Sequence, residues 1–188
     1  MQQAALIATK PINEAYGLFC SPINEASVER LLQNLSAATQ KGVTHLHLLF
    51  QSTGGSVGDG ICLYNVFRSL PYDLTIYNVG SVQSIAALAY LGARKRKTTA
   101  SATFVFHRTT MSPQFAMAFA LQAYAESVSF DDRRTEAILR SHITMPTEKW
   151  AKLDHCDLWF TAQEAIDAGV ADEIADFAPP VGATLYYF

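Results

Sequence analysis

A serine at the end of a short turn is the first residue of the sequence whose position could support chemistry. Ser84 follows the turn 80–83, between an expected strand at 74–79 and an apolar helix at 85–91. Such a serine is exposed at the end of its strand, and the backbone N–H of the next residue can face an oxyanion at the positive end of the helix. Val82 stands where the G-x-S-x-G nucleophile elbow has glycine. The turn alone therefore also fits a serine that merely caps a helix.

A second turn between a strand and a helix occurs earlier in the sequence. The segment 52–56, with the sequence STGGS, lies between an expected strand at 43–50 and a helix at 57–70. Paired glycines let the backbone approach a ligand and present amides to it, although an ordinary tight turn is their commoner use. The segment lacks the G-x-x-x-x-G-K-[ST] pattern of a phosphate loop. Because both turns fall at the same edge of a parallel sheet, together they favour a binding or catalytic site there.

A serine nucleophile needs a base, and the base needs an acid to orient it. His107 ends an expected strand at 103–107, at the same edge as Ser84, and is the best-placed base. For the acid, spacing leaves Asp131, Asp154 and Asp157 open. The other histidines fit other roles: His45 and His47 share one face of a strand, His142 ends a helix, and His155 lies in a short Asp-His-Cys-Asp cluster. Consecutive residues rarely converge on one ion, so we expect no metal site.

The order of the expected elements provides a scaffold for these residues. Strands and helices alternate through the centre of the chain, which predicts an α/β fold with a right-handed parallel sheet covered by helices. The remaining expected elements are a strand at 15–20, a helix between Asn24 and Lys41, a basic turn at 95–97, a helix at 147–153, a strand at 158–160, a helix begun by the capping box 161–164, a strand at 170–174 and an extended tail.

One expected helix is unusually long. The segment Gln114–His142 has no glycine or proline, and its first half is apolar nearly all round. A helix of this length protrudes from a compact domain, and an apolar protrusion is an exposed patch unless another molecule covers it. The pattern therefore favours self-association. The alternative is a helix that folds back onto its own sheet.

Composition limits the class of protein. The 188 residues are 49% hydrophobic, which predicts one folded domain over residues 1–188. The net charge of −3 offers no basic excess for nucleic acid. The apolar runs are too short for a membrane span, and the first residues do not read as a signal peptide. The three cysteines, Cys20, Cys62 and Cys156, form no disulfide framework, so we expect a cytoplasmic location.

At these residues the sequence resembles the proteolytic subunit of the ATP-dependent Clp protease, over about residues 16–174. The family's serine-proline-glycine-glycine turn corresponds to 52–55, and its glycine-x-alanine-x-serine turn to 80–84. Its histidine at a strand end corresponds to His107. Its acid before a strand and a helix start corresponds to Asp157 in 157–165, and its glycine-leucine-valine-aspartate ending to 169–172. Each motif is modest, but their order and intervals together are specific.

The resemblance implies a fold, an activity and a set of roles. The fold is a crotonase-like stack of ββα units with a parallel sheet and a protruding handle helix, here at about 114–142. The activity is that of a serine endopeptidase. In it Ser84 attacks the peptide carbonyl, His107 takes and returns the proton, and Asp157 orients and stabilises the histidine. The amides of Gly55 and Ile85 bind the oxyanion.

The resemblance also implies an assembly. Handles of the family join two rings that enclose the active sites, so we expect a homo-oligomer of one or two stacked rings that cuts peptides or unfolded proteins. A Clp-type ATPase would consume the ATP, and the chain itself would need no cofactor. The segment before the first strand is shorter than usual, and Arg108-Thr109 replaces glutamine-proline. These departures leave ATPase docking, ring size and substrate preference open.

Three other readings remain. A crotonase-class acyl-CoA enzyme shares the fold but does not need Ser84, His107 and Asp157 together. A non-catalytic Clp-like ring subunit is expected to lack one of the three, and this chain has all of them. A serine–lysine peptidase could use Lys95 or Lys97, although His107 makes a lysine base redundant.

Overall fold

The elements come from a computed structural model, which describes residues 14–112 and 117–188. Strands and helices alternate through the first half of the chain, and helices dominate the second half. In chain order they are β1 (Glu14–Cys20), α1 (Glu25–Gln40), β2 (His45–Ser52), α2 (Val57–Ser69), β3 (Asp73–Gln83), α3 (Ile85–Tyr90), β4 (Lys95–Thr98), β5 (Thr103–Phe106), α4 (Ala118–His142), α5 (Thr147–Lys152), β6 (Leu158–Thr161), α6 (Ala162–Asp167), β7 (Glu173–Ile174) and β8 (Leu185–Tyr187).

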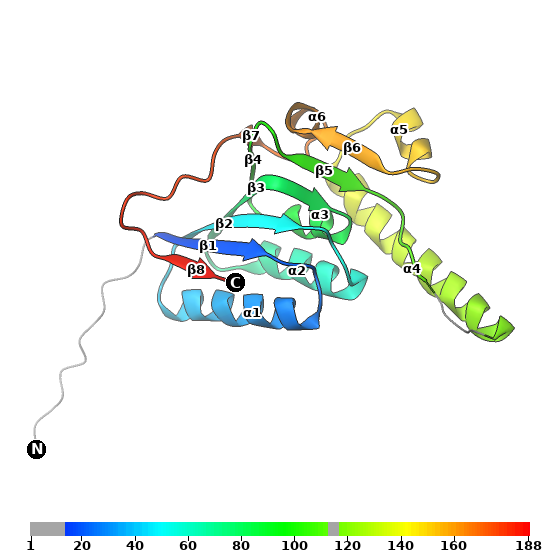
Figure 1. Ribbon diagram of the computed structural model, residues 1–188, viewed down its shortest axis with the longest axis horizontal. Helices are drawn as coiled ribbons and strands as arrows, with labels where there is room; N and C mark the ends of the chain where they lie inside the picture. The colour runs from blue at the N-terminus through cyan, green and yellow to red at the C-terminus, as the bar shows by residue number, and fades with distance from the viewer. Residues whose placement is uncertain (1–13, 113–116) are drawn as a thin grey trace, which may run out of the picture.

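One sheet organises the described part of the chain (Figure 1). Its main path runs β6-β5-β3-β2-β1-β8, and β4 and β7 branch from β3. The pairs are parallel except β5 with β6, which is antiparallel. The first half of β3 pairs with β4 and its last residues pair with β5. The α/β fold with a parallel sheet and a long helix, predicted from the sequence, is confirmed.

Helices α1, α2 and α3 cover one face of the sheet (Figure 1). Their apolar side chains pack with Leu46, Leu48 and Ile76 of the central strands, which are fully buried. Asn24 caps α1 in a reciprocal capping box with Ser27, as the sequence predicted for its start. Because parallel strands run the same way, the turns after β2 and β3 meet at one edge, where α2 and α3 begin.

Helix α4 leaves this body and extends away from the sheet (Figure 1). Of its residues only Leu139, near its C-terminal end, is buried. Large apolar side chains in its first half are exposed, among them Phe119 at 74% and Phe130 at 57%. The helix therefore does not fold back onto its own sheet. The predicted start at Gln114 lies outside the described residues.

Two local predictions were wrong, and a third was incomplete. The basic segment 95–97 belongs to strand β4, because its backbone pairs with β3 and β7. Arg96 and Lys97 also form ion pairs with Asp172 and Glu173, at 2.6 and 3.1 Å. The turn at 80–83 is instead the end of β3, held by its pairing with β5. The tail is not merely extended: β8 pairs with β1, and the buried Phe188 donates its N–H to the Leu18 carbonyl.

Candidate active site

Ser84 occupies the junction between β3 and α3 in an unusual backbone conformation. Its φ is +55° and its ψ −134°, and no other non-glycine residue of the described chain has a positive φ. Its side chain makes no capping hydrogen bond to α3, so the simple helix-cap role is not the one seen. The Ser84 N–H donates to the Val105 carbonyl at 2.8 Å, which fixes the junction to β5. Strained positions of this kind cluster at functional sites.

The Gly54-Gly55 turn packs directly on Ser84. A Cβ atom on Gly54 would lie 2.6 Å from the Cβ of Ser84, and Gly54 has a φ of +90°. Ile23 bridges the turn through the Gly54 carbonyl and the Ser56 N–H, each at 2.8 Å. This pairing leaves the Gly55 N–H on the other side of the chain, with no backbone acceptor among the described residues. The turn therefore presents a free amide beside the serine.

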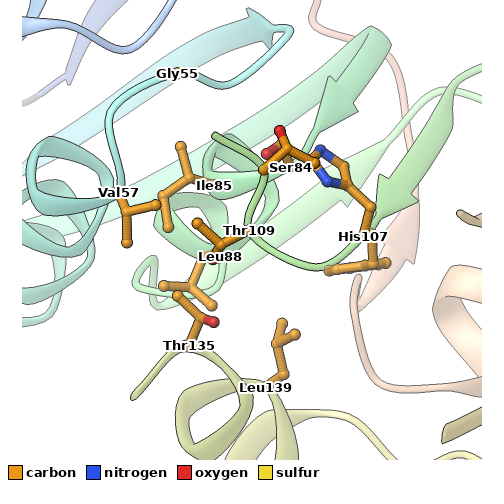
Figure 2. A pocket seen from close by; sticks show the side chains of 11 residues that line it. Gly55, Val57, Ser84, Ile85, Leu88, His107, Thr109, Thr135 and Leu139 are labelled. Atoms are coloured by element: carbon orange, nitrogen blue, oxygen red, sulfur yellow. The ribbon is translucent and has the colours of Figure 1, made fainter. Parts of the chain in front are cut away.

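A small pocket of about 70 Å³ opens at this junction. Figure 2 shows Ser84 and His107 on the same side of it, with the His107 ring directed toward the serine. Its lining comes from the Gly55 turn and the start of α2, from Ser84 and α3, from the end of β5 with the segment after it, and from α4: Gly55, Val57, Ser84, Ile85, Leu88, Phe106, His107, Thr109, Thr110, Thr135 and Leu139. The structure therefore brings together four of the five predicted site residues, namely Ser84, His107, Gly55 and Ile85.

His107 is held by the backbone of its neighbour. Its Nδ1 lies 2.6 Å from the carbonyl oxygen of Arg108. A carbonyl oxygen only accepts hydrogen bonds, so Nδ1 carries the proton of the neutral ring and Nε2 keeps its lone pair. Nε2 is the nitrogen that a general base of this kind uses. No hydrogen bond joins His107 to Ser84 in the described residues, and such bonds are often long before substrate binds.

Asp157 is the predicted site residue that does not line the pocket. It precedes β6, whose antiparallel register pairs Leu158 with Phe106. Continuing that register by one residue sets Asp157 opposite His107, and side chains at opposite positions are direct neighbours. Its carboxylate is exposed, with no hydrogen bond or ion pair among the described residues. The backbone is thus placed for a His107 partner, whereas the side-chain contact is not made.

The other two acids that the spacing left open are each bonded to an arginine. Asp154 accepts hydrogen bonds from the Arg108 guanidinium, with its Nε at 2.9 Å, and this bonding lowers the pKa of the Asp154 carboxyl. Asp131 pairs with Arg134 at 2.8 Å on the same helix. Of the three candidates, Asp157 alone has no ion pair among the described residues, and the continued β5–β6 register sets it opposite His107.

The remaining titratable candidates lie elsewhere. His45 and His47 stack at 4.2 Å and bond to Thr75 and Tyr77, on the sheet away from the pocket. His142 Nε2 is hydrogen-bonded to the Tyr64 hydroxyl at 2.8 Å. Within residues 14–112 and 117–188, no group of His, Cys, Asp and Glu could hold a metal ion.

The two lysines that could act as the base of a serine–lysine peptidase lie in β4. Lys95 and Lys97 pair in register with Thr75 and Tyr77 of β3, and neither lines the pocket. Lys97 is paired with Glu173 at 3.1 Å. This placement removes the geometric basis for a lysine base at Ser84.

Sequence reasoning missed the contribution of α4 to the pocket. Thr135 and Leu139 line it, and Glu136 binds the Arg108 guanidinium at 2.6 Å. No local pattern indicates these contacts, because they join segments far apart in the chain. The one signal was the pair Arg108-Thr109, noted as a departure directly after His107.

A strained serine at a strand-to-helix junction, a histidine at the end of the next strand and free amides beside them form the arrangement that serine hydrolases use. The Clp protease family model matches residues 2–177. The chain is 26% identical to the ATP-dependent Clp protease proteolytic subunit 3 of Streptomyces coelicolor, covering 89% of this chain and 78% of that one. It is 28% identical to the subunit of the same name from Rhodococcus jostii, covering 93% and 89%.

A solved structure of similar fold is that of an Asn-to-Asp mutant of ClpP1 from Listeria monocytogenes. It aligns with a TM-score of 0.75 at 20% identity, covering 86% of this chain and 91% of that one. The chain belongs to the Clp protease family, because the family model spans most of its length.

Proposed function

We propose that Ser84, His107 and Asp157 are the catalytic residues of this chain, which as a Clp protease family member is a serine-type endopeptidase. The observation that supports this assignment best is the shared pocket of Ser84 and His107 at a serine held with positive φ. The free amides of Gly55 and Ile85 beside that serine support the same reaction class, acyl transfer through an oxyanion.

The proposed reaction begins when the Ser84 Oγ attacks the peptide carbonyl and its proton passes to His107 Nε2. The carbonyl electron pair becomes an oxyanion, which the Gly55 and Ile85 amides bind. The C–N bond then breaks, and His107 gives its proton to the leaving amine. Water repeats these steps on the acyl-enzyme and releases Ser84. Asp157, which the continued β5–β6 register sets opposite His107, stabilises the imidazolium that forms in each half.

We propose peptides and unfolded proteins as substrates and a homo-oligomer of one or two rings as the working form. The exposed apolar side chains of α4 support an assembly in which that helix is covered by another copy. Association with a Clp-type ATPase and a cytoplasmic location remain predictions from the sequence, as does a single domain over residues 1–188. No described helix is long and apolar enough to cross a membrane.

The test is covalent labelling of the purified protein with a fluorophosphonate probe, followed by mass spectrometry of the adduct. We expect one adduct, on Ser84, and no labelling of Ser84→Ala. His107→Ala is expected to reduce the labelling rate by about 10³-fold or more, since members of such a triad act as a unit.

Ser56→Ala is the matched control, because Ser56 caps α2 close to the same pocket but has no role in the reaction. It is expected to label at the wild-type rate. Labelling that persists in Ser84→Ala, or an unlabelled wild-type protein in a folded oligomer, would overturn the assignment. The second result would favour the acyl-CoA or non-catalytic reading.

A further inference from the structure

We infer that Arg108 is a positioning residue for His107: its carbonyl holds the ring in the tautomer that leaves Nε2 as the base, and its guanidinium anchors that carbonyl. This inference deepens the proposed function and rests on it. In a usual triad the acid both fixes the tautomer of the histidine and stabilises its positive charge. Here the Arg108 carbonyl sets the tautomer of His107, and Asp157 supplies the negative charge.

The backbone around Arg108 needs an anchor. Strand β5 ends at Phe106, and residues 107–112 belong to no helix or strand. The carbonyl that meets His107 Nδ1 at 2.6 Å therefore lies beyond the sheet ladder. Its position depends on the contacts of the Arg108 side chain and of the Thr109 backbone, since no neighbouring strand fixes it.

Two carboxylates from different elements hold the Arg108 guanidinium. Glu136 of α4 accepts from Nη1 at 2.6 Å, and Asp154 of the segment before β6 accepts from Nε at 2.9 Å and from Nη2. The hydrogen bond from Arg108 is the main reason that the pKa of Glu136 is lowered, so the acid is charged at neutral pH. A forked guanidinium bound on two sides is fixed in direction as well as in place.

A third contact holds the residue after Arg108. The backbone N–H of Thr109 donates to Asp132 of α4 at 2.7 Å. Residues 107–109 are thus tied to α4 at two successive residues and to the Asp154 segment at one. This set of contacts holds the segment that directly follows the base.

The experiment compares the inactivation constants of the oligomer with the fluorophosphonate probe. Arg108→Ala is expected to lower the maximal rate, kinact, by about 10²-fold, the cost of a misplacement near 1 Å. The half-saturating concentration, KI, stays at the wild-type value, because Arg108 does not line the pocket. Arg108→Lys keeps the charge but loses the fork, so we expect partial rescue of kinact.

Arg140→Ala is the matched control. Arg140 binds the same Glu136, at 2.7 Å, but its other contact is the Trp150 ring and not the segment after His107. It is expected to leave kinact unchanged. If Arg108→Ala does not fold, Glu136→Gln and Asp154→Asn each remove one anchor, and each is expected to lower kinact by a smaller factor.

Wild-type kinact in Arg108→Ala, or in both single-anchor variants, would overturn the inference, and so would a change confined to KI. Failure of the proposed function is recognised separately. In that case Ser84→Ala labels like the wild-type protein, whereas a failed role for Arg108 leaves labelling dependent on Ser84.

Discussion

The contact between Gly54 and Ser84 makes the smallest possible side chain a requirement of the site. A methyl group on Gly54 would lie 2.6 Å from the Ser84 Cβ and 3.2 Å from its Oγ, at a φ of +90°. We expect Gly54→Ala to displace Ser84, lower the fluorophosphonate labelling rate by about 10²-fold and destabilise the fold by about 1–3 kcal/mol. The measurements are labelling kinetics and thermal unfolding.

Gly58→Ala is the control for this change. Gly58 lies in α2 close to the same turn, and no atom lies within 4 Å of the Cβ it would gain. The added methyl group favours a helix, so we expect unchanged labelling and equal or slightly higher stability. Wild-type labelling in Gly54→Ala would show that the turn does not set the position of the serine.

At the residue scale, the sequence predicted that Ser84, His107 and the Gly54-Gly55 turn lie at one edge of the sheet, because each lies where a strand ends. The preference for Asp157 over Asp131 and Asp154 came from the family resemblance, since spacing did not separate them. The structure adds a physical reason for this preference: Asp131 is paired with Arg134, and Asp154 is hydrogen-bonded to Arg108. Arg108 could not be assigned from the sequence, because its acceptors are 28 and 46 residues away.

At the element scale, the end of α4 meets α2 through a neutral histidine. Burial lowers the pKa of His142, and the charges of Arg96 and Arg68 add to the effect. Its Nε2 is hydrogen-bonded to the Tyr64 hydroxyl at 2.8 Å, and that hydroxyl accepts from Arg68 at 2.9 Å. The unfolded chain therefore binds a proton more readily than the folded one below about pH 6.5, and stability falls as the pH decreases.

We expect the melting temperature to drop between pH 8 and pH 5.5, and His142→Gln to drop less because its amide oxygen accepts from Tyr64 at every pH. Part of the decrease remains in that variant, since burial also lowers the pKa of His47. His155→Gln, at an exposed position, serves as the control. An equal decrease in wild-type protein and His142→Gln would contradict this account.

Strand β4 shows why some elements escaped prediction. Its sequence Lys-Arg-Lys is typical of a surface turn. The acidic residues that form ion pairs with Arg96 and Lys97 lie more than 70 residues further along the chain. Strand β8 escaped for the same reason, since its partner β1 is at the other end of the described chain. Elements with local signals, such as α1 with its capping box, were predicted nearly to the residue.

At the scale of the whole molecule, the first half of α4 exposes several large apolar side chains to solvent. Replacing Phe119, exposed at 74%, with aspartate puts a charge where a covered helix needs an apolar group. We expect Phe119→Asp to shift the assembly to smaller species in native mass spectrometry while each protomer remains folded. The reason is the cost of burying an unpaired charge.

Gln122→Glu is the control, because it adds the same charge at an exposed polar position of the same helix. It is expected to assemble like the wild-type protein. Identical assembly of Phe119→Asp and the wild-type protein would mean that another surface of the protomer carries the self-association.

The backbone of Ser84 also has an evolutionary consequence. A serine at a φ of +55° costs of the order of 1–3 kcal/mol that a glycine at the same place would not. Under the proposed function, Ser84→Gly therefore strengthens the fold and removes the nucleophile. If Ser84 is the nucleophile, as proposed, a copy of this chain that no longer needed to cut peptides would lose nothing by that exchange, and its fold would gain stability.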